Sequence, residues 1–137
     1  MANALYPKWK EATLQASSGS ALNGSGTTGV YAALVTSAYT YSATDQFYSS
    51  LSGVIGTPQE ITAKSYTNGL FDGADVTYTA VAGGSTGTAI VLYIQNAGAS
   101  TTWRLFAYID TGVSGLPVVT NGGDITISWN ASGIVQL

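Results

Sequence analysis

Cysteine and histidine are both absent from the 137 residues. Their absence excludes disulfides, thiolate nucleophiles, imidazole bases and zinc sites of the usual kinds. Charge is scarce too, at 8% of the chain against roughly 25% in an average globular protein. Hydrophobic residues still reach 45%, which argues for a packed core and against intrinsic disorder. The length suits a single domain.

Positive charge is the scarcest kind, with four Lys and Arg against seven Asp and Glu and a net charge of −3. Beyond the N-terminal segment only Lys64 and Arg104 remain, so we expect neither a nucleic-acid partner nor a polybasic membrane anchor. No apolar run is long enough to span a bilayer. Lys8, Lys10 and Glu11 lie where a signal peptide would need its apolar region, so we expect the chain to be made and folded in a cytosol.

The N-terminal segment is the one convincing helix candidate, over residues 5–16. Pro7 suits a first helical turn, where its missing N–H costs nothing. Apolar residues recur at three- and four-residue spacing at Leu5, Trp9, Ala12 and Ala16. An isolated helix of this length is marginal in water, so the apolar stripe must dock on its own domain or on a partner.

Residues 17–29 are rich in glycine and serine and predict a flexible link. We therefore divide the chain into a helix and link, residues 1–28, and a β domain, residues 29–137. On this interpretation, removal of residues 1–16 should leave the β domain folded.

From residue 29 onward the hydrophobic period changes to two. Half-buried strands are predicted at residues 59–67, 75–81 and 124–129, where apolar and polar residues alternate. Strands apolar on both faces, and hence central or in contact with another molecule, are predicted at residues 29–36, 88–95 and 102–110. A short last strand is predicted at residues 133–137.

Residues 45–52 predict a short helix with Asp45 as its N-cap, or a loop. Together with the turn signals between the runs, these patterns indicate an all-β fold. We expect an antiparallel two-sheet β-sandwich with a short N-terminal helix or arm. A jelly roll and an immunoglobulin-like topology are not separable from this pattern.

Gly24, Gly26 and Gly29 match the dinucleotide-binding fingerprint as a string. That motif must follow a strand and open a helix, so that the pyrophosphate meets the helix N-terminus. Here it follows the predicted helix and opens a predicted strand. We therefore discard this interpretation.

Other catalytic or metal chemistry has little support. Asp72 and Asp75, with Asn68 nearby, offer oxygen atoms to calcium, but calcium loops usually bring more carboxylates. Paired carboxylates of a glycosidase would need a pocket that raises one pKa, and no pattern points to one. We expect no enzyme activity, no catalytic residue, no bound metal and no cofactor.

The aromatic residues include nine tyrosines and three tryptophans. Those on predicted strands are expected to pack within the protein, namely Tyr78, Tyr93, Trp103, Tyr108 and Trp129. The others are harder to place, namely Tyr31, Tyr39, Tyr41, Tyr48 and Tyr66. Tyrosine is favoured at interfaces and also stacks on sugars, so both remain open for this second group.

Four stretches carry a resemblance to a known family, in the same order along the chain. They are MANALYPKWKEA, TNGLFDGADVTY, RLFAYIDTGVSGLPV and NGGDITISWN, the last followed by the closing IVQL. The sequence resembles a family of small structural proteins from the virions of tailed bacteriophages. The glycine-rich segment 17–29 departs from that pattern, which leaves the start of the first long strand open.

The resemblance implies a capsid decoration, or cement, protein that binds outside the major capsid protein lattice and stabilises the shell as a dimer or trimer. The contact residues that we predict are Leu5, Tyr6, Trp9 and Leu14. Two alternatives remain, a tail, neck or fibre-associated component and a carbohydrate-binding β-sandwich for host attachment.

Overall fold

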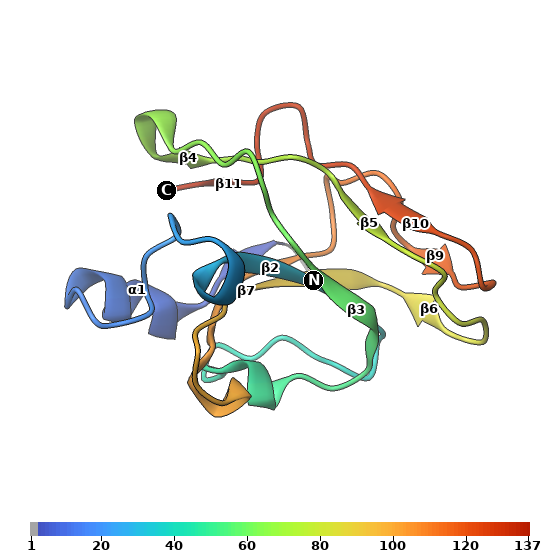
Figure 1. Cartoon of the computed structure of the whole chain (residues 1–137), viewed down its shortest axis with the longest axis horizontal. Helices are drawn as coiled ribbons and strands as arrows, with labels where there is room; N and C mark the ends of the chain where they lie inside the picture. The colour runs from blue at the N-terminus through green and yellow to red at the C-terminus, as the bar shows by residue number, and fades with distance from the viewer. Residues whose placement is uncertain (1–2) are drawn as a thin grey trace.

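The computed structural model describes residues 3–137, which form a mainly β fold with one short α-helix (Figure 1). The helix is α1, Pro7–Leu14. The strands are β1 Ala4–Leu5, β2 Val30–Val35, β3 Val54–Glu60, β4 Leu70–Phe71, β5 Val76–Tyr78, β6 Thr86–Gly87, β7 Ala89–Ile94, β8 Arg104–Ile109, β9 Val118–Val119, β10 Ile125–Ile127 and β11 Val135–Gln136. Single 3₁₀ turns lie at Gly26–Thr28, Tyr48–Ser50, Thr67–Gly69 and Ser100–Thr102.

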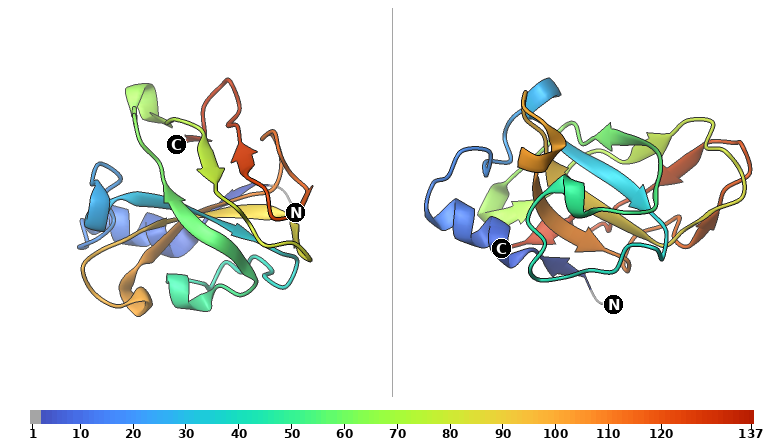
Figure 2. Two further views of the ribbon diagram at one scale, coloured as in Figure 1. Left: turned by 45° about the vertical axis from the view of Figure 1, so that its right-hand side comes forward. Right: turned by 90° about the horizontal axis from the view of Figure 1, so that it is seen from below.

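Five strands form an antiparallel main sheet in the order β1-β8-β7-β2-β3. Its three inner strands are the ones that the sequence predicts to be apolar on both faces, and that prediction is confirmed. Strand β7 is buried over its whole length. Segment 36–53 covers one face of the sheet, and the chain's other strands lie over the opposite face (Figures 1 and 2).

The covering strands form three separate two-stranded ribbons, β10–β5, β11–β4 and β6–β9. They lie together on one side of the main sheet (Figure 1). The fully buried Tyr78 of β5 ties the two layers together, because its hydroxyl donates a hydrogen bond of 2.7 Å to the backbone oxygen of Ala32 in β2. The prediction of an antiparallel, mainly β fold is confirmed at this level.

Two predicted elements differ from the structure. The strand expected at residues 59–67 lies earlier, at Val54–Glu60, because Ala63 adopts a left-handed backbone with φ 51° that ends any extended run. Ile61 nevertheless points inward, as expected, and is fully buried. Segment 45–52 contains only the turn Tyr48–Ser50, and its N-cap is Phe47 rather than Asp45.

The N-terminal helix docks on the chain's own body, which answers the question that the sequence left open. Strand β1 pairs with β8 through Ala4 and Leu5. Directly after it, Tyr6 is fully buried, and Trp9 of α1 is only 3% exposed. The Trp9 ring packs 4.6 Å, centroid to centroid, from Phe106 of β8. The expected division at residue 28 therefore separates no independent cores, and removal of residues 1–16 would take two large side chains out of the shared core.

The segment predicted as a flexible link is tied down along its length by side chains from other parts of the fold. The Trp9 indole N–H donates to the backbone oxygen of Ser20 at 2.9 Å, and Lys64 donates to that of Gly24. The Tyr66 hydroxyl donates to the backbone oxygen of Leu22. These bonds hold the helix and the segment after it against the body, which the glycine content alone does not reveal.

Replacing Trp9 by alanine should lower the free energy of unfolding by about 3–5 kcal/mol, because a large side chain leaves a well-packed core. Leu14→Ala on the same helix is the matched control. Leu14 is 88% exposed, so its replacement should change stability by less than about 0.5 kcal/mol. Urea unfolding followed by tryptophan fluorescence and circular dichroism measures both. Equal, small effects would show that the helix is not docked in solution.

Candidate functional site

The four predicted contact residues lie in different surroundings. Tyr6 and Trp9 are part of the core and present almost no surface. Leu5 is half-buried at the edge of the main sheet, and Leu14 projects from the end of α1. In this conformation only Leu5 and Leu14 are placed to contact a partner, while Tyr6 and Trp9 fix the segment that carries them.

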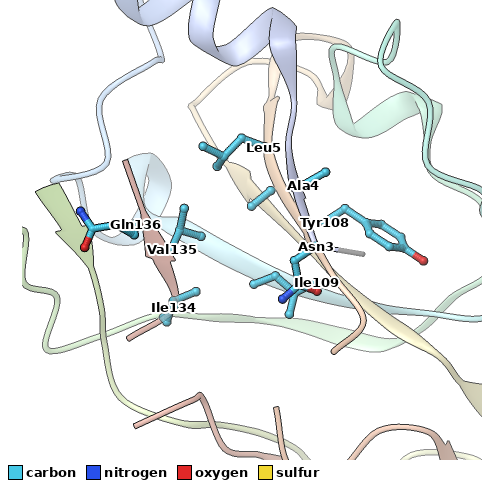
Figure 3. A pocket seen from close by; sticks show the side chains of 9 residues that line it. Asn3, Ala4, Leu5, Tyr108, Ile109, Ile134, Val135 and Gln136 are labelled. Carbon is cyan, nitrogen blue, oxygen red and sulfur yellow. The ribbon is translucent and has the colours of Figure 1, made fainter. Parts of the chain in front are cut away.

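Leu5 lines a hollow of about 220 Å³ between the main sheet and β11. Its apolar lining comes from β1, β8 and the C-terminal segment, namely Ala4, Leu5, Ala107, Ile109, Ile134 and Val135. In Figure 3, Leu5 and Val135 point from their two strands into the same space. A second hollow of about 380 Å³ shares the lining residues Asn3, Ile109, Ile134, Val135 and Gln136 and continues the first. We call the two together the β1–β11 trough.

Among residues 3–137, no charged side chain lines either part of the trough. Its polar groups are neutral amides and hydroxyls together with backbone. Asn3 fixes one wall, because its Oδ1 accepts hydrogen bonds from the backbone N–H groups of Asp110 at 2.8 Å and Thr111 at 3.0 Å. The edge strand β1 is therefore held at both ends. Asn3, just before it, accepts from the residues after β8, and Tyr6, just after it, donates its N–H to the backbone oxygen of Phe106 in β8.

In the part of the chain that the structure describes, the backbone at both walls of the trough has one side to which no further strand is paired. Because the Tyr6 N–H bonds to Phe106, the alternation of an antiparallel ladder turns the N–H and C=O of Leu5 away from β8. Likewise, the Leu137 N–H bonds to Gly69 in the β4 segment, so the backbone groups of Gln136 point away from β4. The trough thus lies beside two open strand edges.

A third hollow, of about 310 Å³, lies between α1 and the C-terminal residue Leu137. Trp9, Leu22 and Tyr66 contribute to its lining. Leu137 is 64% exposed and Tyr66 43% exposed. Gln136 lines the trough and Leu137 lines this third hollow, so exposed apolar surface continues on both sides of the C-terminal strand.

The opposite edge of the main sheet is protected. Strand β3 contains Pro58, which has no N–H to offer, and Gly56, whose φ of 64° interrupts the extended backbone. The pairing of β2 with β3 shifts register between Ala32 and Leu34. Proline and bulges are common devices that prevent edge-to-edge pairing. Of the two edges of the main sheet, β1 is therefore the one more accessible to pairing with another strand.

A chain of buried hydroxyls supports β1 from the other face of the sheet. The Tyr39 hydroxyl donates to Asp45 at 2.7 Å, so the Tyr6 hydroxyl, 2.7 Å away, donates to Tyr39. Burial raises the pKa of Tyr6 and of Tyr39 well above the usual value, and the acidic neighbour Asp45 adds to this effect. Tyr41 packs against Tyr6 and its hydroxyl donates to the backbone oxygen of Leu5, with 3.4 Å between the two oxygens.

A second aromatic group consists of Tyr31, Tyr48, Tyr93 and Trp103. The Tyr93 ring lies between Tyr31 and Trp103, stacked on each with ring centroids 5.8 and 5.7 Å apart. The Trp103 indole N–H donates to the backbone oxygens of Asn96 and Gly98. Tyr93 and Trp103 thus pack within the protein, as the sequence predicts for strand aromatics, and Tyr31 and Tyr48, which the sequence left open, pack on the same rings.

Two carboxylates, Asp75 and Glu60, accept hydrogen bonds from the backbone. Asp75 accepts a hydrogen bond of 3.0 Å from the backbone N–H of Trp129, at the end of β10. Glu60 accepts one of 2.8 Å from the N–H of Gly26, inside the glycine string. Within residues 3–137, no three His, Cys, Asp or Glu side chains are grouped so that they would hold a metal ion. Across the same residues, no helix has both the length and the apolar character needed to span a membrane.

Comparisons with protein-family models, with curated proteins and with solved structures find no match to this chain. The resemblance to phage virion proteins therefore stays a hypothesis, and the geometry has to support any function. Sequence reasoning found Leu5 as a surface residue but missed Ile134 and Val135. The C-terminal segment lies across the trough from β1 because β11 pairs with β4 while β1 pairs with β8. No local pattern in the sequence reports either of these distant pairings.

The buried tyrosines predict loss of stability in alkali. Burial raises the pKa of Tyr6, Tyr39, Tyr78 and Tyr93, whereas in the unfolded chain each ionises near pH 10. Stability should therefore be complete below pH 10 and fall above it, by about 1.4 kcal/mol per pH unit for each tyrosine that stays protonated when folded. Urea unfolding between pH 8 and pH 11, with tyrosinate absorbance near 295 nm, tests this. Reversible ionisation of all nine tyrosines without unfolding would contradict it.

Proposed function

We propose that this chain is a non-enzymatic structural protein of a tailed-bacteriophage virion, a decoration protein that binds the outer surface of the major capsid protein lattice and stabilises the shell. The observation that carries the proposal is the β1–β11 trough, lined by apolar and neutral polar groups, beside the β1 edge of the main sheet. The resemblance in sequence suggests the major capsid protein as the partner, and the trough is a surface suited to binding it.

The physical argument concerns the cost of desolvation. Burying charged groups at an interface is expensive unless each is paired, whereas apolar surface gains free energy when water leaves it. Among the described residues, no charged side chain of the trough has to be desolvated, and Tyr66 and Leu137, which line the third hollow, add exposed apolar surface. Such a surface suits lasting attachment to a large assembly.

Shell stabilisation follows from mass action. A protein that binds only the assembled lattice lowers the free energy of that state relative to separate subunits. Dimers or trimers, which we propose for this chain, would also engage several lattice sites at once and gain avidity. The absence of cysteine fits folding and assembly in a reducing host cytoplasm.

For the fold, we propose a two-sheet β-sandwich in which the three ribbons act together as the second layer. Tyr78 connects that layer to β2, and Ile125 and Ile127 of β10 add buried side chains to the same core. Jelly-roll and immunoglobulin-like connections both remain compatible with this layering.

Cryo-electron microscopy of the virion that contains this protein tests the function. We expect density for the chain on the outer shell between capsomers, in hundreds of copies, with the β1–β11 trough turned towards the lattice. Density confined to the tail or neck, in about a dozen copies or fewer, would replace the decoration role with the alternative location. Absence from the particle would refute a structural role altogether.

A further inference from the structure

We propose that Asn23 is a site of spontaneous covalent modification, where the side-chain amide is lost as ammonia and the isoaspartate product releases the segment of residues 17–29 from the body of the fold. The reaction is deamidation through a cyclic imide, and its only co-reactant is water. The structure separates Asn23 from two other asparagines that are also followed by glycine.

The chemistry at Asn23 balances with water alone. The backbone nitrogen of Gly24, after giving up its proton to base, bonds to the Cγ carbon of Asn23. The Cγ–Nδ2 bond breaks, and the departing nitrogen takes up a proton and leaves as ammonia. Water then opens the imide, at Cγ to give aspartate or at the backbone carbonyl carbon to give isoaspartate. Glycine favours the cyclisation because it has no side chain to hinder the approach of its nitrogen.

The sequence offers three equivalent places for this reaction. Asparagine precedes glycine at Asn23, Asn68 and Asn121. All three asparagines lie exposed on loops or turns, so water reaches each of them. Neither the dipeptide nor its exposure therefore distinguishes the three, and the difference has to come from the hydrogen bonds around them.

Hydrogen bonds restrain the attacking nitrogen at two of the three places. The Gly69 N–H, next to Asn68, donates to a backbone oxygen of its own turn at 3.2 Å, and the Gly122 N–H donates to the backbone oxygen of Val81 at 2.8 Å. The Asn121 side chain is held as well, because its Oδ1 accepts a hydrogen bond from a backbone N–H at 2.9 Å. Since these bonds must break before cyclisation, local opening slows both reactions.

The reacting groups at Asn23 carry no such restraint. Among residues 3–137, neither the Asn23 side chain nor the Gly24 N–H has a hydrogen-bond partner in the protein. Asn23 borders hollows of about 250 and 310 Å³, which give its side chain room to turn. Glycine is also required at residue 24, because a Cβ atom there would collide with the backbone oxygen of Thr28. The fold thus keeps the residue that cyclises most readily beside an unrestrained amide.

The product would act on an anchor that lies directly beside it. The Lys64 ammonium donates a hydrogen bond to the backbone oxygen of Gly24. Isoaspartate at residue 23 routes the main chain through the side-chain carbons, which inserts an extra carbon atom just before Gly24. The insertion moves the Gly24 oxygen away from Lys64 and frees the segment there. Aspartate, the other product, adds a negative charge but leaves the main chain unchanged.

Peptide mapping by mass spectrometry, on the full chain aged in mildly alkaline buffer, tests the site. In the folded protein we expect Asn23 to deamidate about tenfold faster than Asn68 or Asn121, because each of those must first lose a hydrogen bond. In concentrated urea the three rates should become similar. Equal rates in the folded protein, or a faster rate at Asn68 or Asn121, would overturn the proposal. A preference for Asn23 that persists in urea would also overturn it, because the fold would not be its cause.

Two variants test the release of the segment. Asn23→Gln keeps an amide, but its longer side chain cyclises far more slowly, so no isoaspartate should accumulate at residue 23. Freshly prepared Asn23→Asp carries the new charge on an unchanged main chain. Hydrogen exchange at the amides of Gly26 and Thr28, which are bonded in the folded protein, should be about tenfold faster in the isoaspartate form than in Asn23→Asp. Equal exchange in the two forms would overturn the release.

Discussion

Three strands that are apolar on both faces set the main constraint on this structure. β2, β7 and β8 leave no face of the sheet for water, so both sides must be covered by other parts of a 137-residue chain. The ribbons cover one side with aliphatic side chains together with Phe71 and Tyr78. Segment 36–53 covers the other with tyrosines. The same requirement explains why the N-terminal segment packs as strand and helix against β8 instead of extending into solvent.

Covering both faces of the main sheet does not close its two edges, which are the strands β3 and β1. At the β3 edge, Gly56 and Pro58 discourage further pairing. At the β1 edge, a two-residue strand ends the sheet, and the opposing C-terminal strand leaves an apolar opening between the layers. The asymmetry between the two edges is what gives the molecule its candidate binding surface.

The sequence predicted best where a signal is local. Runs of apolar residues identified the inner strands, and Pro7 with the spacing of Leu5, Trp9 and Ala12 identified the helix. Prediction from the sequence failed where a contact between distant residues decides where a side chain or segment lies in the fold. Tyr6 lies outside the helical stripe, yet it is fully buried. The pairing of β1 with β8 places the Tyr6 ring beside Tyr39 and Tyr41. The glycine-rich segment is fixed by side chains that lie about 40 residues away in the sequence. Strand β3 was misplaced because Gly56 and Pro58 carry the chemistry of a turn.

The pairing of β1 with β8 also orders the events of folding. About 100 residues separate Leu5 from its partner Ala107, and at translation rates of roughly 5–20 residues per second the ribosome needs about 5–20 s to make them. During that interval the first strand has no place to pair, and Tyr6 and Trp9 remain in contact with water or with a chaperone. The main sheet therefore gains its edge strand β1 only late in synthesis. Contacts between residues this distant in the sequence slow that last step of folding. On polysomes, where nascent chains are crowded together, the waiting segment is the part of the molecule most exposed to exchange between neighbouring copies.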